Sequence, residues 1–363
     1  MDYIAIEVDE DKGQVINIGE MYEALKQVED KRQEKGKRYT IEILLMVVIL
    51  AKLCGENTPY GMAGWAKMRA EELQTLLGYH RQVSPSNKTL QRLTDTSVKD
   101  ENVQAVTRAY LHQTYGGQQS ILITIDGKTL RGTIPKGKTR GVHLLAAYLP
   151  EEGVVLLQIE VGDKENEIVA APKLLRQLHL KGRVVSGDAM FTQRAISVEV
   201  LAGGGDYLWF VKDNQPTLHE DVQRFFEEVE HAPGWHIPPV PQMVAEETTK
   251  QAGRLETRRL TAIPDEHNYL HWPGIGTVFK LERHVLRPQT GEERSQVVYG
   301  ITSLGFTPHL ASQLLTWTRQ HWGIENKLHY RRDVTLREDA TRMKQPHQAQ
   351  VVATLNNLSL IHI

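Results

Sequence analysis

The sequence predicts an α/β protein built on a mixed β-sheet with helices on its faces. Three observations predict this class. A helical pattern fills the first third of the chain, strands and helices alternate from about residue 120, and a β-rich stretch precedes one last long helix. Alternating strands and helices favour a sheet covered by helices, since each element must bury its apolar face against another layer.

The bulk composition is that of a globular protein with a sizeable core. The 363 residues are 40% hydrophobic and 24% charged, and a chain of this length suits roughly two to three domains. The most apolar stretch, Ile43–Ala51, is shorter than the roughly 20 residues that cross a bilayer. The acidic start MDYIAIEVDED lacks the apolar core of a secretory signal. We therefore expect a cytoplasmic protein without a membrane partner.

The single cysteine, Cys54, excludes an internal disulfide and a multi-cysteine zinc site. It fits a reducing compartment, and we expect a buried thiol because free cysteine usually behaves as a small hydrophobe.

The net charge of −2 argues mildly against a nucleic-acid protein. The charge is unevenly spread, however: acids gather at Asp2–Asp11 and Glu227–Glu230, and cations at Lys128–Arg140 and Arg331–Lys344. Local patches set the contact with phosphates, so DNA remains a possible partner.

Residues 1–115 form a predicted N-terminal helical domain, a candidate for binding DNA ends. Ser84 or Ser86 is a plausible N-cap of its third helix, with Lys88, Gln91 and Arg92 exposed. A helix-turn-helix and a plain helical bundle are equally compatible with this pattern. The predicted helices are Tyr39–Cys54, Met62–Leu77 and Ser86–Thr94.

Residues 116–363 form the second predicted domain. Its order of three strands, helix, strand, helix and strand is the framework of an RNase H-like domain. The predicted elements are strands Ile121–Ile125, Val142–Tyr148 and Val154–Val161, helix Glu165–Leu178, strand Arg183–Ser186, helix Thr192–Leu201 and strand Tyr207–Val211.

A β-rich insertion interrupts this domain at about residues 216–308, before the last long helix, Leu310–Arg332. After a short helix at Leu218–Glu230, strands are predicted at Glu256–Ala262, Gly276–Arg283 and Gln296–Thr302.

Three carboxylates are the candidate catalytic and metal-binding residues. Asp126 and Asp188 each follow a predicted strand, where the side chains of open α/β sheets converge. Glu325 lies beside the apolar stripe of the last helix. Taken alone, each aspartate is better explained as an ordinary turn or cap residue, and Glu325 as a solvated glutamate. Together they suit Mg²⁺, which prefers carboxylate oxygens, and we see no Walker loop, GxSxG elbow or HExxH motif as a rival.

Five strings resemble the DDE insertion-sequence transposases related to the H-repeat-associated proteins, and similarity continues through the helical head. The strings are IDGKTLRG (125–132), GDKENEI (162–168), GDAMFTQ (187–193), FVKDNQPTLHEDV (210–222) and HWGIENKLHYRRDVTLREDATR (321–342).

The resemblance implies a DNA transposase that cleaves at its element's ends and joins the 3′-hydroxyls to target DNA, with Asp126, Asp188 and Glu325 holding two Mg²⁺ or Mn²⁺ ions. It implies a homodimer on DNA and no small-molecule cofactor. The superfamily's Tyr-x2-Arg-x3-Glu-x6-Lys signature is altered: Thr318, His321 and Arg332 stand at the Tyr, Arg and Lys places. DNA-binding roles for His321 and Arg332 are therefore open.

Lys128 and Arg131 are candidates for binding DNA phosphates, and the alternative is that they belong to a solvated loop. Lys212, Asn214 and Gln215 are candidates for binding the DNA backbone, and the alternative is that they form a turn. Weaker candidates on one strand are Arg254, Arg258 and Arg259.

Two other functions remain: an inactive or domesticated DNA-binding relic, and an RNase H-like repair nuclease. The ending LSLIHI matches one reading frame of a common sequencing adapter, so we expect the natural chain to be longer.

Overall fold

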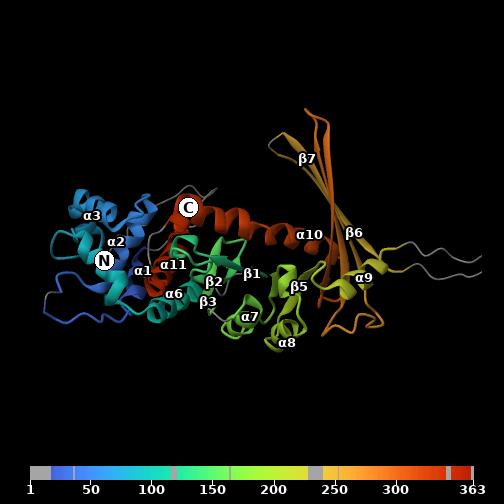
Figure 1. The fold of residues 1–363 in the computed structure, drawn as a ribbon, viewed down its shortest axis with the longest axis horizontal. Helices are drawn as coiled ribbons and strands as arrows, with labels where there is room; N and C mark the ends of the chain where they lie inside the picture. The colour runs from blue at the N-terminus through green and yellow to red at the C-terminus, as the bar shows by residue number, and fades with distance from the viewer. Residues whose placement is uncertain are drawn as a thin grey trace, which may run out of the picture. The chain divides into compact units, whose positions relative to one another are not determined.

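The computed structural model describes residues 18–35, 37–115, 121–162, 165–227, 240–251, 253–340 and 345–360 (Figure 1). The chain divides into two compact units, each made of separate segments. The first unit comprises residues 1–119, 127–165 and 325–363, and the second comprises residues 120–126 and 166–324. Strand β1 (Leu122–Thr129) runs from the second unit into the first.

The first unit combines helices with two antiparallel strands. Helix α11 contacts α2, α6 and β3, so the end of the chain packs into the core of this unit. The helices are α1 (Ile18–Leu25), α2 (Ile41–Leu53), α3 (Pro59–Met68), α4 (Ala70–Leu76), α5 (Asn87–Arg92), α6 (Asp100–Tyr115) and α11 (Pro346–Leu360), and the strands are β2 (His143–Leu149) and β3 (Val154–Glu160).

Helix α2 is the centre of the helical head, with 10 of its 13 residues buried. Ser86 caps α5 by accepting a hydrogen bond of 3.2 Å from the backbone N–H of Thr89. Of the two predicted candidates, Ser84 and Ser86, Ser86 is therefore the N-cap. The helix predicted at Met62–Leu77 is instead two helices that meet at Arg69. The prediction of a buried Cys54 is wrong: the residue is exposed at the end of α2, where Gly55 turns the chain with φ +87°.

The second unit carries the parallel strands and the β-rich segment. Strand β4 pairs in parallel with β1 and β5, and β9 joins β5 antiparallel. Its elements after β1 are α7 (Glu167–Leu175), β4 (Val184–Gly187), α8 (Arg194–Ala202), β5 (Asp206–Val211), α9 (Pro216–Arg224), β6 (Met243–Gln251), β7 (Arg254–Pro264), β8 (Thr277–Arg287), β9 (Glu292–Thr302) and α10 (Leu310–His321).

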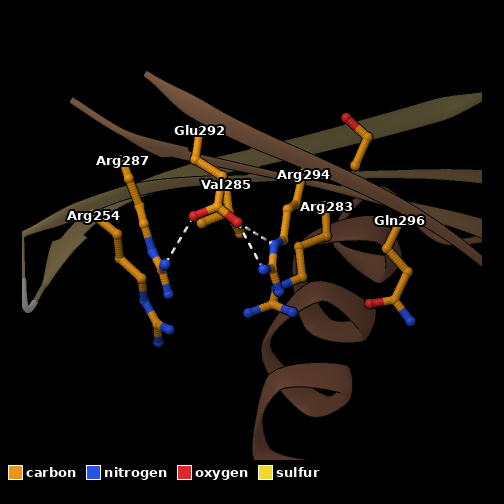
Figure 2. A pocket seen from close by; sticks show the side chains of 8 residues that line it. Arg254, Arg283, Val285, Arg287, Glu292, Arg294 and Gln296 are labelled. Carbon is orange, nitrogen blue, oxygen red and sulfur yellow. Dashed lines mark hydrogen bonds and ion pairs between the residues drawn. The ribbon is translucent and has the colours of Figure 1, made fainter. Parts of the chain in front are cut away.

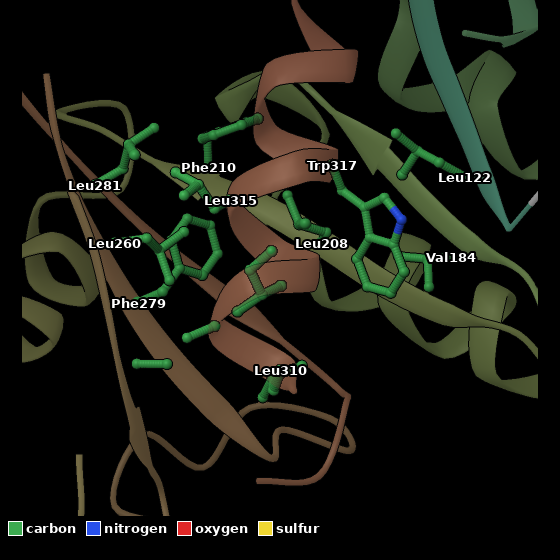
Figure 3. Close-up of a cluster of buried hydrophobic side chains, with 13 residues drawn as sticks. Leu122, Val184, Leu208, Phe210, Leu260, Phe279, Leu281, Leu310, Leu315 and Trp317 are labelled. Atoms are coloured by element: carbon green, nitrogen blue, oxygen red, sulfur yellow. The ribbon is translucent and has the colours of Figure 1, made fainter. Parts of the chain in front are cut away.

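Helix α10 is fixed by an apolar cluster that it shares with the sheet. Leu314 and Trp317 of α10 belong to the same buried cluster as Phe210 of β5 and Phe279 of β8 (Figure 3). Because α10 also contacts β6 and β7, the β-rich segment forms a platform for the last helix of this unit.

The strand order is β3-β2-β1-β4-β5-β9-β8-β7-β6. In its first five members, β2 and β3 are antiparallel and β1, β4 and β5 are parallel. Along the chain these strands follow the predicted succession of three strands, helix, strand, helix and strand, and the predicted fold class is confirmed. The sequence missed β6, whose polar pattern hides a strand. The helix predicted at Leu310–Arg332 ends earlier, at His321, and π-helical turns follow at Ile324–His329 and Arg331–Thr335. No described helix is long and apolar enough to cross a membrane.

Candidate active site

Asp126 lies on β1 and Asp188 directly follows β4, at equivalent positions of two neighbouring parallel strands. The register pairs Ile125 with Gly187, and each aspartate is the next residue. A Cβ on Gly187 would lie 2.8 Å from the Phe191 ring, so only glycine allows the chain to pack this closely before Asp188. Asp126 was expected at the end of a strand, but β1 continues to Thr129. Only the pairing of β1 with β4 ends at the residue before Asp126. The two carboxylates thus share one edge.

A buried polar chain lies behind Asp188. The hydroxyls of Thr124 and Ser186 are 3.0 Å apart, and Ser186 Oγ is 3.1 Å from His321 Nδ1. His321 is buried, and its Nε2 faces Asp188 Oδ1 at 3.9 Å, longer than a hydrogen bond. If Thr124 donates to Ser186 and Ser186 donates to Nδ1, the remaining ring proton lies on Nε2 and points to the carboxylate. The chain therefore orients His321 toward Asp188.

The electrostatic surroundings keep Asp188 ionised. His321 is the main cause that lowers the pKa of this carboxyl below its ordinary value, and Lys212 adds to it, while partial burial opposes both. The side chain of Asp188 remains 48% exposed. An ionised, accessible carboxylate is the form that binds a cation.

The candidate DNA-binding residues that follow β5 are Lys212, Asn214 and Gln215, and the last two contact the turn after Asp188. Lys212 is exposed, and its ammonium lies 6.0 Å from the centre of the Trp322 ring. The Asn214 side-chain amide donates to the carbonyl of Ala189 at 2.8 Å, and that of Gln215 donates to the carbonyl of Thr192 at 3.1 Å. These two amides hold the turn, whereas Lys212 supplies positive charge.

Three predicted residues lie in the first unit with charged partners. Lys128 is buried and bonds to Asp333. Arg131 is 80% exposed and lies 3.7 Å from Asp339. Arg332 is fully buried, and its Nε donates to Glu338 at 2.7 Å. Only Arg131 among these presents its guanidinium to solvent; burial leaves Arg332, like His321, no surface for a phosphate.

Glu325 also belongs to the first unit, where it is exposed in the π-helical segment Ile324–His329. It follows His321, the last residue of α10, by four positions along the chain.

The paired aspartates suit a hard cation. Among the described residues, no group of three or more His, Cys, Asp or Glu side chains lies close enough to hold a metal ion. Two carboxylates at one edge nevertheless supply oxygen ligands of the kind that Mg²⁺ prefers, and this ion fills its other positions with water and phosphate. The donor set at this edge therefore fits Mg²⁺.

Sequence reasoning missed Thr124 and Ser186. Both look like ordinary strand residues, and only the pairing of β1 with β4 puts them side by side beneath the acids. A hydroxyl at the same distance before each aspartate was the available signal.

The strand order and the paired aspartates define an RNase H-like protein with an acidic edge. Comparison with known families is more specific: residues 117–361 match the Transposase DDE domain family, and residues 22–111 match the DDE_Tnp_1-associated family. The chain belongs to the DDE transposase family, which confirms the resemblance of its motifs. A DDE domain implies an enzyme that uses divalent metal ions.

Two relatives from Escherichia coli (strain K12) extend over most of the chain. The putative protein YbfL is 27% identical and the H repeat-associated putative transposase YhhI 26% identical, each over 95% of this chain and 90% of the relative. Among solved structures, a piggyBac transposase synaptic complex with hairpin DNA is similar with a TM-score of 0.45 and 12% identity, over 94% of this chain and 71% of that one.

Proposed function

We propose that the protein is a DNA transposase that cleaves at the ends of its own insertion sequence and joins the 3′-hydroxyls to target DNA. The observation that carries this proposal is that Asp126 and Asp188 each follow the last paired residues of two neighbouring parallel strands in a DDE-family domain. We propose Glu325 as the third carboxylate of the set, as the family's motif implies.

The reaction is an in-line displacement at phosphorus. Water attacks the phosphodiester, the bond to the 3′-oxygen breaks, and that oxygen takes up a proton to become the free 3′-hydroxyl. In the joining step this hydroxyl loses its proton, bonds to a target phosphorus and displaces the target's 3′-oxygen. Two Mg²⁺ or Mn²⁺ ions would activate the nucleophile and stabilise the leaving oxygen.

The surrounding side chains would prepare the carboxylates and hold the DNA. His321 would position Asp188, Lys212 and Arg131 would contact DNA phosphates, and Asn214 with Gln215 would maintain the turn after Asp188. Lys128, already bonded to Asp333, would stabilise the end of β1 instead. We expect a homodimer on DNA, because one complex must hold two ends.

The test is cleavage of a duplex carrying the element's own end by purified full-length protein. We expect nicking and then joining with Mg²⁺ or Mn²⁺. Ca²⁺, which coordinates more loosely, should support binding with little cutting. End binding without cutting in any metal would favour the inactive relic.

Glu325→Gln tests the third carboxylate, since it keeps the side-chain shape and removes the charge. It should abolish cutting and leave end binding largely intact, and Glu282→Gln, at a β8 glutamate whose side chain is 42% exposed, is the matched control. Cutting by Glu325→Gln at the wild-type rate would show that the third carboxylate is misassigned.

A further inference from the structure

Strands β7, β8 and β9 bring arginines from three successive strands together on one face of the sheet. Figure 2 shows Arg254, Arg283, Arg287 and Arg294 extending to the same side of the sheet around a hollow. The volume of this hollow is about 490 Å³. The register and the alternation of side chains place these residues in three rows. The rows are Arg254, Arg287 and Glu292; Glu256, Val285 and Arg294; and Arg258, Arg283 and Gln296.

This arginine face, defined by the residues of these rows, carries excess positive charge. Glu256 contacts Arg254, Arg258 and Arg283 at 3.8, 2.6 and 2.7 Å. Glu292 contacts Arg287 and Arg294 at 2.8 and 2.6 Å. Five guanidinium groups therefore face two carboxylates, which leaves three positive charges in excess. Glu247 of the neighbouring strand β6, opposite Arg258 in the register, pairs with Arg319 of α10 and does not change the balance.

The opposite face of the same strands has no such excess. By the same alternation, its cations are matched by an equal number of glutamates. On β7, β8 and β9 they are Arg259 and Lys280 against Glu282 and Glu293, and on the neighbouring strand β6 Lys250 is matched by Glu246. On a sheet face where arginine serves only to keep the surface solvated, positive and negative charges would be balanced, as they are on this opposite face. The asymmetry indicates a ligand with negative charge.

The size of the face selects the kind of ligand. Three rows along a strand span about 13 Å, because alternate residues are roughly 6.7 Å apart. One strand of B-form DNA presents a phosphate about every 3.4 Å of helix axis, so this length matches several phosphates rather than one small anion. Arginine suits them because its planar fork binds phosphate oxygens in pairs and never loses its charge.

We propose that the arginine face binds the phosphate backbone of double-stranded DNA, independently of base sequence. This inference rests on the proposed function and adds a second contact to it, on the β-rich segment rather than at the carboxylates. Glu292 acts as an internal competitor, since it holds Arg287 and Arg294 until phosphates replace it.

The experiment compares glutamates that are adjacent in sequence and lie on opposite faces. Binding of full-length protein to a generic duplex, lacking any element end, is measured with increasing salt. Glu292→Gln frees two arginines and should tighten binding at least threefold. Glu293→Gln makes the same charge change on the opposite face and should have less than half this effect. Equal effects of the two substitutions would overturn the proposal.

A loss-of-function pair is the second arm. Arg287→Gln with Arg294→Gln should weaken binding on the order of tenfold and reduce the slope of log affinity against log salt by about 1.8, or about 0.9 for each phosphate that is no longer neutralised. Lys250→Gln with Arg259→Gln is the matched control. A loss of affinity no greater than the control's would overturn the proposal.

Cleavage of element ends by the wild type, run in parallel, separates the two proposals. Absent cutting with intact face-specific binding contradicts only the proposed function. Normal cutting without face-specific binding contradicts only the arginine face.

Discussion

The two compact units treat charged side chains in opposite ways. In the second unit, Asp188 is half exposed at a sheet edge, and His321 and Lys212 lower the pKa of its carboxyl. In the first unit, Lys52 is buried, and burial lowers the pKa of its ammonium to about 8 despite the attraction of Glu338. The surroundings of Asp188 favour its charge, whereas those of Lys52 oppose it. Charge at the edge is thus available to a ligand, while charge in the interior reduces stability.

The largest expected effect is at the edge. Asp126→Asn and Asp188→Asn should each lower metal-dependent cutting by at least about a thousandfold, since members of one catalytic unit act together. The double variant should be little worse than either single one. Thermal unfolding should be nearly unchanged, because the charges lie at an accessible edge. Wild-type cutting rates in both single variants would refute the assignment of this edge as the active site.

The interior should respond in stability instead. Arg332→Met removes the charged partner of Glu338, which keeps only neutral hydrogen bonding from Asn356, and should reduce the free energy of unfolding by about 3 kcal/mol or more, as when one partner of a buried pair is removed. Arg176→Met breaks the exposed pair with Glu199 and should change it by less than about 1 kcal/mol. Urea denaturation measures both. Similar values for the two would remove the distinction between buried and exposed charge.

Lys52→Met tests the interior in the other direction. The pKa of Lys52 is near 10.5 in the unfolded chain and about 8 in the folded chain. Between pH 8 and pH 10.5 the unfolded chain therefore binds more protons than the folded chain. The free energy of unfolding of the wild type should therefore rise as pH rises from about 8 to 10.5. Below pH 8, the buried charge of Lys52 lowers this free energy by an amount on the order of 3 kcal/mol. Lys52→Met should stabilise the protein at pH 7, with a gain that shrinks as pH approaches 10. The exposed Lys67→Met should show no such pH dependence, and a constant gain for Lys52→Met would contradict the burial argument.

The smallest expected effect concerns His321, which contacts Asp188 without being a ligand in the proposal. His321→Leu should reduce cutting by about 10–100-fold and raise the Mg²⁺ concentration needed for half-maximal rate, as is typical when the partner of a metal ligand is lost. His321→Gln, which can still hydrogen-bond, should recover part of both. A purely structural role predicts reduced stability with an unchanged Mg²⁺ requirement.

The core strands, and the position of Asp188 directly after one of them, could be predicted from the sequence alone, whereas the continuation of β1 past Asp126 could not. Strand patterns and the residues that follow them are local, so they can be read without knowing the partners. The apolar helix around Ile41–Leu53 and the Ser86 cap are local in the same way.

Which side chains meet became known only from the folded structure. Ser186 reaches His321 across 135 residues, and Lys128 meets Asp333 across 205. The arginine face depends on a strand register in which a shift of one residue would send each side chain to the opposite face. Neither register nor burial can be read along the chain, because both follow from packing among distant segments. Packing therefore gives charges that look alike in the sequence different surroundings: an accessible sheet edge, a buried ion pair or an exposed face rich in arginine.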